Sequence, residues 1–500
     1  MGFGLSDLLP DSIREQVLAR ITPSQEEIDL QEKLIHQLTD ALTQKVESTK
    51  FQYSFIEPQG STGKKQTQLR GAADIDLFVA LKPEDYPEVF METNVPNRQA
   101  IDDIMNRLVS NWFEPAIRNL EVTDVQRAFS QHPFLSLKME GIDIDILGCF
   151  DIDAETLAEK GPITAVDRTV HHSSYIADGM NQKKREDARI LKSFVRACHA
   201  YGDTCAVGRM GLTGVTLEIL VLINSDLKSA FKALRKLDTE PVDPQTRNLD
   251  ELRKIPAYRD DHIFLIDPTD HSRNMASSFS PRSYAWVQYK IDRVLENLQT
   301  GDTSTTLDSF IESPISNNKL PNWLGNHSCV REFQSDSKVH YTILRDRLHR
   351  LARKVTVEMT VERTGETRFG EILTEVYFDD TRYALGMLVE FPTVSKTFDR
   401  TGPPVRLNEA AEKFREAHSD AVFEEDGFLY IRENREWTSA SKMFDSILEN
   451  NSIEGLEIQS SKTILSNQVL NVLQDYVLPI ESEFKERITR VKQKEKNHST

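Results

Sequence analysis

Two aspartates separated by one residue, Asp74 and Asp76, stand at the start of the apolar run DIDLFVAL, residues 74–81. Side chains of a strand alternate between its two faces, so both carboxylates point to one face while Ile75 and Leu77 point to the other. Two carboxylates this close repel each other unless a cation lies between them. Mg²⁺ prefers oxygen ligands and usually shares them with substrate phosphates. The spacing therefore predicts a divalent-metal site for a substrate that carries phosphate.

The loop before this run, GSTGKK at residues 60–65, contains the residue types that hold a triphosphate. Gly60 permits close approach of the backbone, Ser61 offers a hydroxyl and a backbone N–H, and Lys64 or Lys65 offers a positive charge. An isolated D-x-D pair is most often a solvated edge of a sheet. A G-S pair followed at this distance by D-x-D, at the start of a strand, instead favours a nucleotide site.

A second run, GIDIDILGCF at residues 141–150, repeats the pattern. Asp143 and Asp145 share one face of an apolar strand, and either would reach the first pair from a neighbouring strand. The alternative is an edge strand with one polar face. Two D-I-D strands in one α/β unit favour a shared site for two metal ions, with the third carboxylate left open between Asp143 and Asp145.

Hydrophobic periodicity and turn signals place these runs within a series of elements, and SQEE at residues 24–27 predicts a capping box before a long helix. Helices are expected over 5–50 and near 98–118, strands over 52–57, 74–81 and 134–150, a mostly helical stretch over 183–300, and a mixed region over 330–395. The loop DRTGPPVRL, a helix, the hairpin AVFEEDGFLYIRENRE and another helix follow. A final amphipathic helix precedes a tail, VKQKEKNHST, that is expected to be frayed.

The 500 residues are too many for one hydrophobic core, and their net charge of −18 disfavours a generic nucleic-acid binder. Phosphate contacts need only a local basic patch, however. The candidate patch is a single helical stripe whose opposite side is apolar, and taken alone it is best explained as the solvated face of an amphipathic helix. The stripe consists of Arg185, Arg189, Lys192 and Arg196, and the apolar side of Leu191, Val195 and Cys198.

Other features of the sequence indicate the cellular compartment of the protein. No run of eighteen apolar residues is present, and the N-terminus lacks the basic and apolar regions of a secretion signal. The four cysteines form no C-x-x-C pair and no zinc spacing, so they are expected to be buried or free thiols in a reducing environment. We therefore expect a cytoplasmic protein with no membrane partner.

Four ordered motifs, together with the G-S loop and its D-I-D strand, resemble those of the archaeal-type (class I) CCA-adding enzymes, which are tRNA nucleotidyltransferases of the polymerase β-like nucleotidyltransferase superfamily. The motifs are TAVDRTVHH at 164–172, ARILKSFVRACHAYG at 188–202, LIDPTDHSRNMASSFS at 265–280 and GPPVRLNEAAEKF at 402–414. Their order along the chain carries more weight than any single match.

The resemblance implies a multidomain α+β fold with a polymerase β-like nucleotidyltransferase palm, a helical central domain, and an α/β RNA-binding body and tail. It implies a catalytic head at 1–160, a helical neck at 161–300, an RNA-binding body at 301–395, a tail domain at 396–455, and a C-terminal helix at 456–500 that packs on the body and ends frayed.

Carried over position by position, the resemblance implies which residues form the site. The catalytic residues and ligands of Mg²⁺ would be Asp74, Asp76 and Asp145. The triphosphate would be bound by Ser61, Lys64, Lys192 and Tyr201, the sugar and phosphates by Thr169 and His172, and the base by Arg273. Two of these assignments have an ordinary alternative. His172 could be a surface histidine, and Arg273 could pair with Asp267 or Asp270 as a structural salt bridge.

The implied activity is template-independent addition of CCA to the 3′ end of tRNA from CTP and ATP, by two-metal in-line nucleotidyl transfer. The partner would be the acceptor and TψC arms of tRNA, with a homodimer as an allowed assembly. Two alternatives remain: a signalling nucleotidyltransferase that makes oligonucleotides, which would not need the module at 330–500, and a non-catalytic RNA-binding relative, which would not need the carboxylates. The loop STGKKQTQ lacks the family's usual alanine and tryptophan, so the choice between Lys64 and Lys65 stays open.

Overall fold

The computed structural model describes the chain except for residues 1–7, 73, 91–94, 130–131, 419–420 and 498–500. Its contacts divide the chain into two compact units, each described by itself below. Unit 1 comprises Met1–Gly202 and Met210–Ser313, and unit 2 comprises Asp203–Arg209 and Pro314–Thr500. In the part that the structure describes, no helix is long and apolar enough to cross a membrane.

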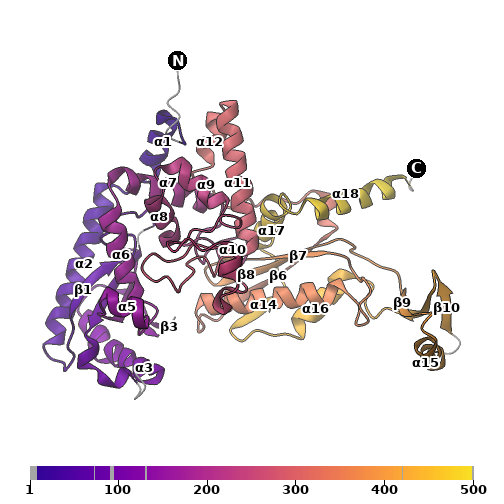
Figure 1. The fold of residues 1–500 in the computed structure, drawn as a ribbon, viewed down its shortest axis with the longest axis horizontal. Coiled ribbons are helices and arrows are strands. Elements are labelled where there is room, and N and C mark those ends of the chain that lie inside the picture. Colours follow the sequence, from indigo (N-terminus) through magenta and orange to yellow (C-terminus); the bar gives the residue numbers. More distant parts are fainter. Residues whose placement is uncertain (1–7, 73, 91–94, 130–131, 419–420, 498–500) are drawn as a thin grey trace. The chain divides into compact units, whose positions relative to one another are not determined.

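Unit 1 begins at the indigo end of the chain (Figure 1). It contains a five-stranded sheet of order β1-β2-β5-β4-β3, in which β2 and β5 run parallel and the other neighbours antiparallel. The strands are β1 (Phe55–Gln59), β2 (Asp74–Leu81), β3 (Thr123–Phe129), β4 (Pro133–Met139) and β5 (Ile142–Phe150). Strand β3 was not expected from the sequence. The run expected as one strand over 134–150 is two strands, because Glu140 and Gly141 both take positive φ and turn the chain between them.

Helices cover one face of this sheet, and the other face carries the carboxylates at one end and packs against the start of α6 (Asp167–Gly179) farther along the strands. The covering elements are α2 (Gln25–Val46), α3 (Arg98–Leu108), the π-helical turn η3 (Val109–Phe113) and α4 (Glu114–Ile117), and α1 (Asp11–Ile21) precedes them. Ile75, Leu77, Ile144 and Ile146 point into the core beneath these helices. The capping box at the start of α2 is confirmed, since Ser24 and Glu27 exchange side-chain and backbone hydrogen bonds.

The rest of unit 1 consists of helices and the loops that join them, and one buried aspartate joins this part to the sheet. Asp167, at the start of α6, accepts hydrogen bonds from the backbone N–H groups of Phe150, at the end of β5 (2.8 Å), and of Thr164 (2.6 Å). The helices are α5 (Ala154–Lys160), α6 (Asp167–Gly179), α7 (Gln182–Ala197), α8 (Gly214–Ile223), α9 (Leu227–Arg235), α10 (Leu249–Arg253), α11 (Pro281–Thr300) and α12 (Thr303–Asp308).

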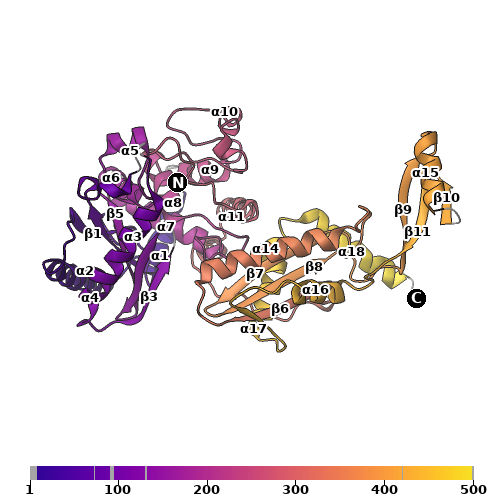
Figure 2. The ribbon, with the colours of Figure 1, turned by 90° about the horizontal axis from the view of Figure 1, so that it is seen from below.

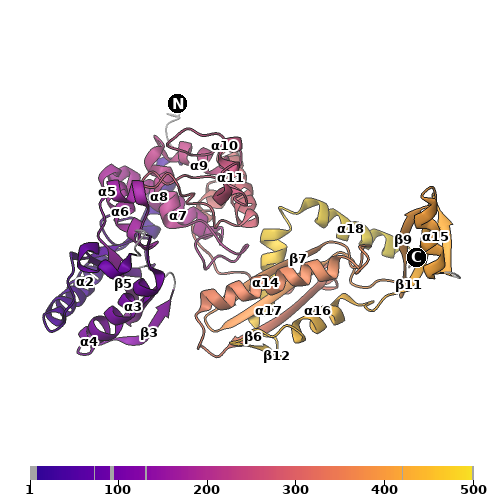
Figure 3. The ribbon, with the colours of Figure 1, turned by 60° about the horizontal axis from the view of Figure 1, so that its bottom comes forward.

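Unit 2 contains a four-stranded sheet of order β12-β6-β8-β7 with helices on both faces (Figure 3). The strands are β6 (Ser328–Ser335), β7 (Ile372–Asp379), β8 (Arg382–Val389) and β12 (Leu456–Gln459). On one face lie α14 (Tyr341–Thr360) and α16 (Ala440–Glu449), and on the other α17 (Ile464–Val472), the π-helical turn η6 (Leu473–Val477) and α18 (Ser482–Asn497). The short α13 (Asn322–Gly325) precedes β6.

A separate three-stranded sheet of unit 2, of order β10-β11-β9, carries α15 (Figure 2). Its strands are β9 (Thr397–Pro404), β10 (Val422–Glu425) and β11 (Phe428–Asn434), and α15 is Asn408–His418. The expected loop around GPPV is therefore wrong in its first part, because that segment is strand β9, paired along β11. The expected frayed tail is helical as far as Asn497, and its last three residues lie outside the described part.

The expectation of a multidomain α+β protein is confirmed, since each of the two units contains both sheet and helices. The five finer domain boundaries stay a prediction. The four cysteines are free thiols, and Cys149, Cys198 and Cys205 are buried.

Candidate active site

Strand pairing brings the two D-I-D motifs side by side on one face of the sheet. In the parallel pair of β2 and β5, Asp76 lies opposite Asp145 and Asp74 lies opposite Asp143. The residues between them point into the core on the opposite face: Ile75 and Ile144 are each 1% exposed. The period of two in each strand therefore turns four carboxylates toward the same side.

The electrostatics of this row single out Asp76 and Asp145. Burial, then the charges of Asp145 and Asp74, raise the pKa of Asp76 to about 6, against a smaller opposing effect of Lys65. Burial also raises the pKa of Asp145, while a hydrogen bond from Ser136 opposes it. The folded protein thus holds partly desolvated carboxylates close together at a cost, which a divalent cation would relieve.

The outer pair of the row is different. Asp143 is 66% exposed on its side chain and pairs with Lys138 at 3.2 Å, so a lysine already neutralises it. Within the described ranges, no three His, Cys, Asp or Glu side chains are grouped closely enough to form a ready-made metal cluster. The carboxylate oxygens of Asp74, Asp76 and Asp145 are suitable ligands for a hard cation. In this structure the three side chains are not grouped tightly around a single point.

The loop that follows β1 lies directly against Asp76. Gly60 has φ +69°, and a Cβ added there would lie 2.9 Å from Asp76 Oδ2, so this close approach requires glycine. The Thr62 hydroxyl donates to the carbonyl of Asp74 at 2.9 Å. The half-buried Ser61 therefore begins a turn that is held over the carboxylates, where the sequence predicted it.

The two lysines of this loop have different environments. Lys64 is half-exposed on its side chain and pairs with Glu57 at 2.7 Å, a contact that solvent screens. Lys65 is 5% exposed, and its ammonium lies 2.7 Å from Glu218 Oε2. Lys65 is therefore built into the interior, whereas Lys64 is accessible to a ligand.

Sequence reasoning missed Gln59, the last residue of β1. It lies opposite Asp76 in the antiparallel pair of β1 and β2, so both side chains occupy the same face. Its side chain is buried, and among the described residues neither the oxygen nor the nitrogen of its amide has a hydrogen-bond partner. Only the register of β1 against β2 reveals this neighbour, and no motif marks it.

The basic stripe of α7 is not a solvated face, and this expectation is wrong. Arg185 donates to the carbonyl of Lys65, Arg189 to those of Gln66 and Gln68, and Lys192 to that of Thr67, at distances of 2.7–3.1 Å. The helix thus clamps the backbone of the loop at 65–68. Arg196 continues the stripe at the surface, where it pairs with Glu312. The apolar side of the helix is buried as expected.

Lys192 and Tyr201, both predicted to bind triphosphate, lie in one buried cluster. The Lys192 ammonium is 3.0 Å from Glu218 Oε1. Burial, followed by the charge of Glu218, raises the pKa of the Tyr201 hydroxyl. A Cβ added to Gly214 would lie 2.5 Å from Tyr201 Oη and 3.3 Å from Lys192 Cε, so both side chains pack against the first residue of α8.

The remaining predicted residues gather around the carboxylate of Asp267. His172 is buried, and its Nε2 lies 2.6 Å from Asp267 Oδ2, so the alternative of a surface histidine is wrong. Arg273 Nη1 lies 3.6 Å from the same oxygen. Burial raises the pKa of Asp267, but hydrogen bonds from His172 and Thr269 outweigh it and lower that pKa. Thr169 is half-buried on α6, three residues before His172.

The structure thus contains the salt bridge that was the alternative role of Arg273, and the partner of Arg273 in it is Asp267, not Asp270. Asp270 is taken by Arg168, whose Nε donates to it at 2.7 Å. The Arg273 side chain remains 39% exposed, and its distance of 3.6 Å from Asp267 is long for a hydrogen bond. Its guanidinium therefore keeps donors for a ligand.

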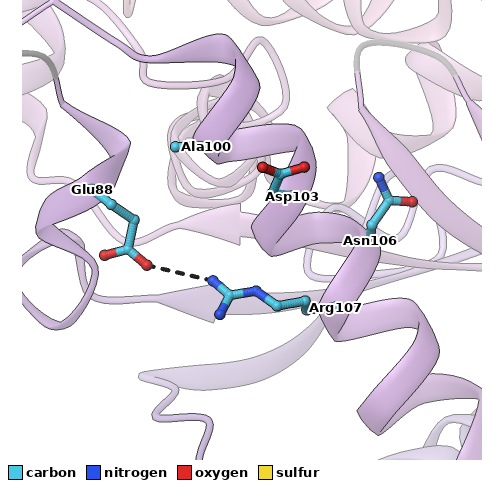
Figure 4. A pocket seen from close by; sticks show the side chains of 5 residues that line it. All are labelled: Glu88, Ala100, Asp103, Asn106 and Arg107. Atoms are coloured by element: carbon cyan, nitrogen blue, oxygen red, sulfur yellow. Dashed lines mark hydrogen bonds and ion pairs between the residues drawn. The ribbon is translucent and has the colours of Figure 1, made fainter.

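A surface pocket of about 620 Å³ lies elsewhere in unit 1 and contains none of these residues (Figure 4). It is lined by Glu88, Ala100, Asp103, Asn106 and Arg107, and Figure 4 shows the Glu88–Arg107 ion pair, of 3.4 Å, at its edge. Most of this lining comes from the exposed side of α3. Because none of the carboxylates, lysines and histidines described above lines this pocket, we assign it no role.

The raised pKa of Asp76 leads to a prediction about stability. In the metal-free protein, Asp76→Asn should raise the free energy of unfolding by about 1–3 kcal/mol near pH 8, because it removes an ionised carboxylate whose folded-state pKa is raised. A raised pKa means that stability is complete below the unfolded value and is lost as the pH rises through the folded value. The advantage of the variant should therefore shrink as the pH falls through about 6.

Thermal unfolding of the wild type and of Asp76→Asn, measured from below about pH 6 to about pH 8, would show the difference in stability. Mg²⁺ should raise the melting temperature of the wild type and have little effect on the variant. Asp143→Asn serves as the control, because Asp143 already pairs with Lys138. A wild-type advantage at pH 8 without metal would contradict the prediction.

Known proteins are similar in sequence to most of this chain. A family model described as tRNA nucleotidyltransferase, second domain, matches residues 186–300. A CCA-adding enzyme of Saccharolobus shibatae is 24% identical over 428 residues, which is 85% of this chain and 90% of that protein. A CCA-adding enzyme of Methanocaldococcus jannaschii is 22% identical over 453 residues, 88% of this chain and 91% of that protein. These relatives confirm the family resemblance drawn from the motifs.

Solved structures resemble the chain more distantly. The structure of CdnC of E. coli MS115-1 with ATP aligns with a TM-score of 0.44 and 12% identity, covering 61% of this chain and 99% of that one. A structure described as that of a cytoplasmic RNA terminal U-transferase aligns with a TM-score of 0.43 and 13% identity, covering 61% and 98%. Likenesses at this level do not bear on the substrate.

Proposed function

We propose that this chain is an archaeal-type CCA-adding enzyme of the tRNA nucleotidyltransferase family and adds CCA to the 3′ end of tRNA from CTP and ATP without a nucleic-acid template. The observation that carries the proposal is the juxtaposition of Asp76 and Asp145 under a glycine-serine loop. Carboxylates beside a turn that carries an accessible lysine are the parts that in-line nucleotidyl transfer requires.

The metal ligands in this proposal are Asp74, Asp76 and Asp145. Their oxygen donors and mutual repulsion fit Mg²⁺, which when bound would activate the 3′-hydroxyl of the tRNA and neutralise the leaving pyrophosphate. The chain's own groups do the rest. Ser61 offers its hydroxyl and N–H to the triphosphate, and Lys64 exchanges its screened contact with Glu57 for a phosphate.

The burial of Lys65 supports Lys64 in this role. An ammonium already paired with a buried carboxylate would have to break that pair to reach a phosphate, at the cost of an uncompensated buried charge. Lys64 has no such cost. Unit 2 would hold the acceptor and TψC arms of the tRNA by shape and backbone contacts, as proteins usually hold double-stranded RNA.

The proposed function is tested by incubating the protein with CTP, ATP, Mg²⁺ and a tRNA that ends before its CCA. Extension by three nucleotides in the order C, C, A supports the proposal. Oligonucleotides made without tRNA would instead indicate a signalling nucleotidyltransferase, and the absence of turnover with intact RNA binding would indicate a non-catalytic relative. A tRNA that already ends in CCA is the control and should not be extended.

Base selection leads to a prediction for Arg273. We propose that its guanidinium donates to the incoming base, because it is partly exposed and presents a rigid fork of donors. Arg273→Ala should raise the free-energy barrier for incorporating C and A by about 1–3 kcal/mol and increase the relative incorporation of U. Stability should change little, because Asp267 keeps its hydrogen bonds from His172 and Thr269.

Single-turnover incorporation of each nucleotide, together with thermal unfolding, measures both effects. Arg247→Ala is the matched control. Arg247 pairs with Asp243 and donates to the carbonyl of His271, so it supports the same segment of chain without reaching Asp267. An Arg273→Ala variant that melts at lower temperature yet keeps its preference for C and A would show that the arginine is only structural.

A further inference from the structure

The carboxylate of Glu218, on α8, is a buried junction of three segments in unit 1. It is fully buried and accepts hydrogen bonds from the ammonium groups of Lys65 and Lys192 and from the Thr67 hydroxyl. We propose that Glu218 is a positioning residue for the nucleotide: its carboxylate, paired with Lys65 and Lys192, holds the loop at 60–68 in the place from which Ser61 and Lys64 bind the triphosphate. This inference rests on the proposed function and extends it to a residue outside the metal row.

The loop is held at both ends, and Glu218 holds the far one. At the near end, Gly60 touches Asp76, and the Thr67 N–H donates to the carbonyl of Ser61 at 3.0 Å, closing the turn. At the far end, Glu218 binds the side chains of Lys65 and Thr67. A shift of the far end is therefore transmitted across one closed turn to Ser61 and its neighbour Lys64.

The same carboxylate holds the two ammonium groups side by side. Burial by itself raises the pKa of Glu218, but Lys192 and Lys65 outweigh it and lower that pKa to about 2. Two lysines against one carboxylate leave the cluster with one excess positive charge, the sign that attracts a triphosphate. Without Glu218, the two lysines would repel each other in a desolvated place, and the loop that carries Lys65 would shift.

The packing of Tyr201 ties this cluster to a second residue expected at the triphosphate. Tyr201 Oη and Lys192 Cε both approach Gly214 so closely that an added Cβ would meet them, at 2.5 and 3.3 Å. Gly214 is one helical turn before Glu218 on α8. The helix that carries the carboxylate therefore also sets the position of Tyr201, and only glycine leaves room for it.

The test is the affinity of the full-length protein for CTP in the presence of Mg²⁺, measured without turnover. Glu218→Gln should weaken CTP binding by about tenfold to hundredfold, because small displacements of binding groups have effects of this size, and should leave the affinity for CCA-less tRNA within about twofold. In steady state the KM for CTP should rise by more than kcat falls. A purely structural role would leave the CTP affinity of the folded fraction unchanged.

Unit 2 provides a matched control. Glu362 is also a nearly buried carboxylate between two cations, paired with Arg368 at 2.7 Å and with Arg435. Glu362→Gln should destabilise the protein in a similar way, because both variants strand buried cations, yet leave CTP affinity within about twofold of the wild type. Equal losses of CTP affinity in the two variants would overturn the proposal, as would wild-type CTP affinity in Glu218→Gln.

A milder variant covers the case in which Glu218→Gln fails to fold. Thr67→Val is nearly isosteric and removes the hydroxyl bond to Glu218 and the long contact of 3.5 Å from the Lys192 ammonium, leaving every charge in place. It should weaken CTP binding by about threefold to tenfold, and unchanged binding in a folded Thr67→Val protein would overturn the proposal. A wild-type protein that binds CTP but does not extend tRNA would overturn the proposed function alone, whereas one that binds no CTP would overturn both.

Discussion

Asp76→Asn is expected to slow the transfer of C and A to tRNA by about a thousandfold or more, while the affinity for tRNA changes by less than about twofold. Asp76 stands between its strand neighbours Asp145 and Gln59, directly under the loop that begins at Gly60. An amide of the same shape keeps the packing but removes the charge that draws a divalent cation into the row. The substitution therefore removes a group that acts on the reacting atoms and leaves the RNA-binding surface as it was.

Single-turnover extension of a CCA-less tRNA and equilibrium binding of the same tRNA measure the two parts of this prediction. Because the same variant should be more stable than the wild type in the absence of metal, its loss of activity cannot be attributed to unfolding. A loss of tRNA affinity as large as the loss of rate would refute the assignment of Asp76 as a metal ligand.

Asp145→Asn should slow transfer by about a hundredfold or more, whereas Asp143→Asn should retain activity within about threefold. Asp145 lies next to Asp76 in the strand register and is partly buried. Asp143 lies one pleat away, is mostly exposed and pairs with Lys138. The two aspartates belong to one D-I-D motif, so each is the control for the other, with the same chemical change on the same strand.

The measurement is the rate of transfer at saturating CTP over a range of Mg²⁺ concentrations. For Asp145→Asn, higher Mg²⁺ should restore part of the rate, because the weakened site still has two of its carboxylates. The reverse order, with Asp143→Asn inactive and Asp145→Asn active, would show that the carboxylate row converges at its outer end and that Asp74 and Asp143 are the central pair.

Some positions around the site could be predicted only in part. The motifs assigned His172 to the sugar and phosphates and Arg273 to the base, but they did not reveal the shared partner, Asp267, which joins chain segments almost a hundred residues apart. The spacing of the basic residues on α7 revealed the stripe, but it did not reveal which groups these residues bind. Charges at helical spacing look the same whether they face water, phosphate or a neighbouring backbone, so the carbonyls of 65–68 could not be foreseen.

What the sequence by itself determined are the features that depend on local geometry. The period of two in a strand turns Asp74 and Asp76 to one face, a glycine before Ser61 permits the loop to approach them, and the capping box starts α2 where it was expected. What only the tertiary structure decided are the partners across strands and helices: Asp145 and Gln59 beside Asp76, and Glu218 beneath Lys65 and Lys192. Strand register and the burial of a charge depend on how distant segments pack, and no pattern within a single segment records that.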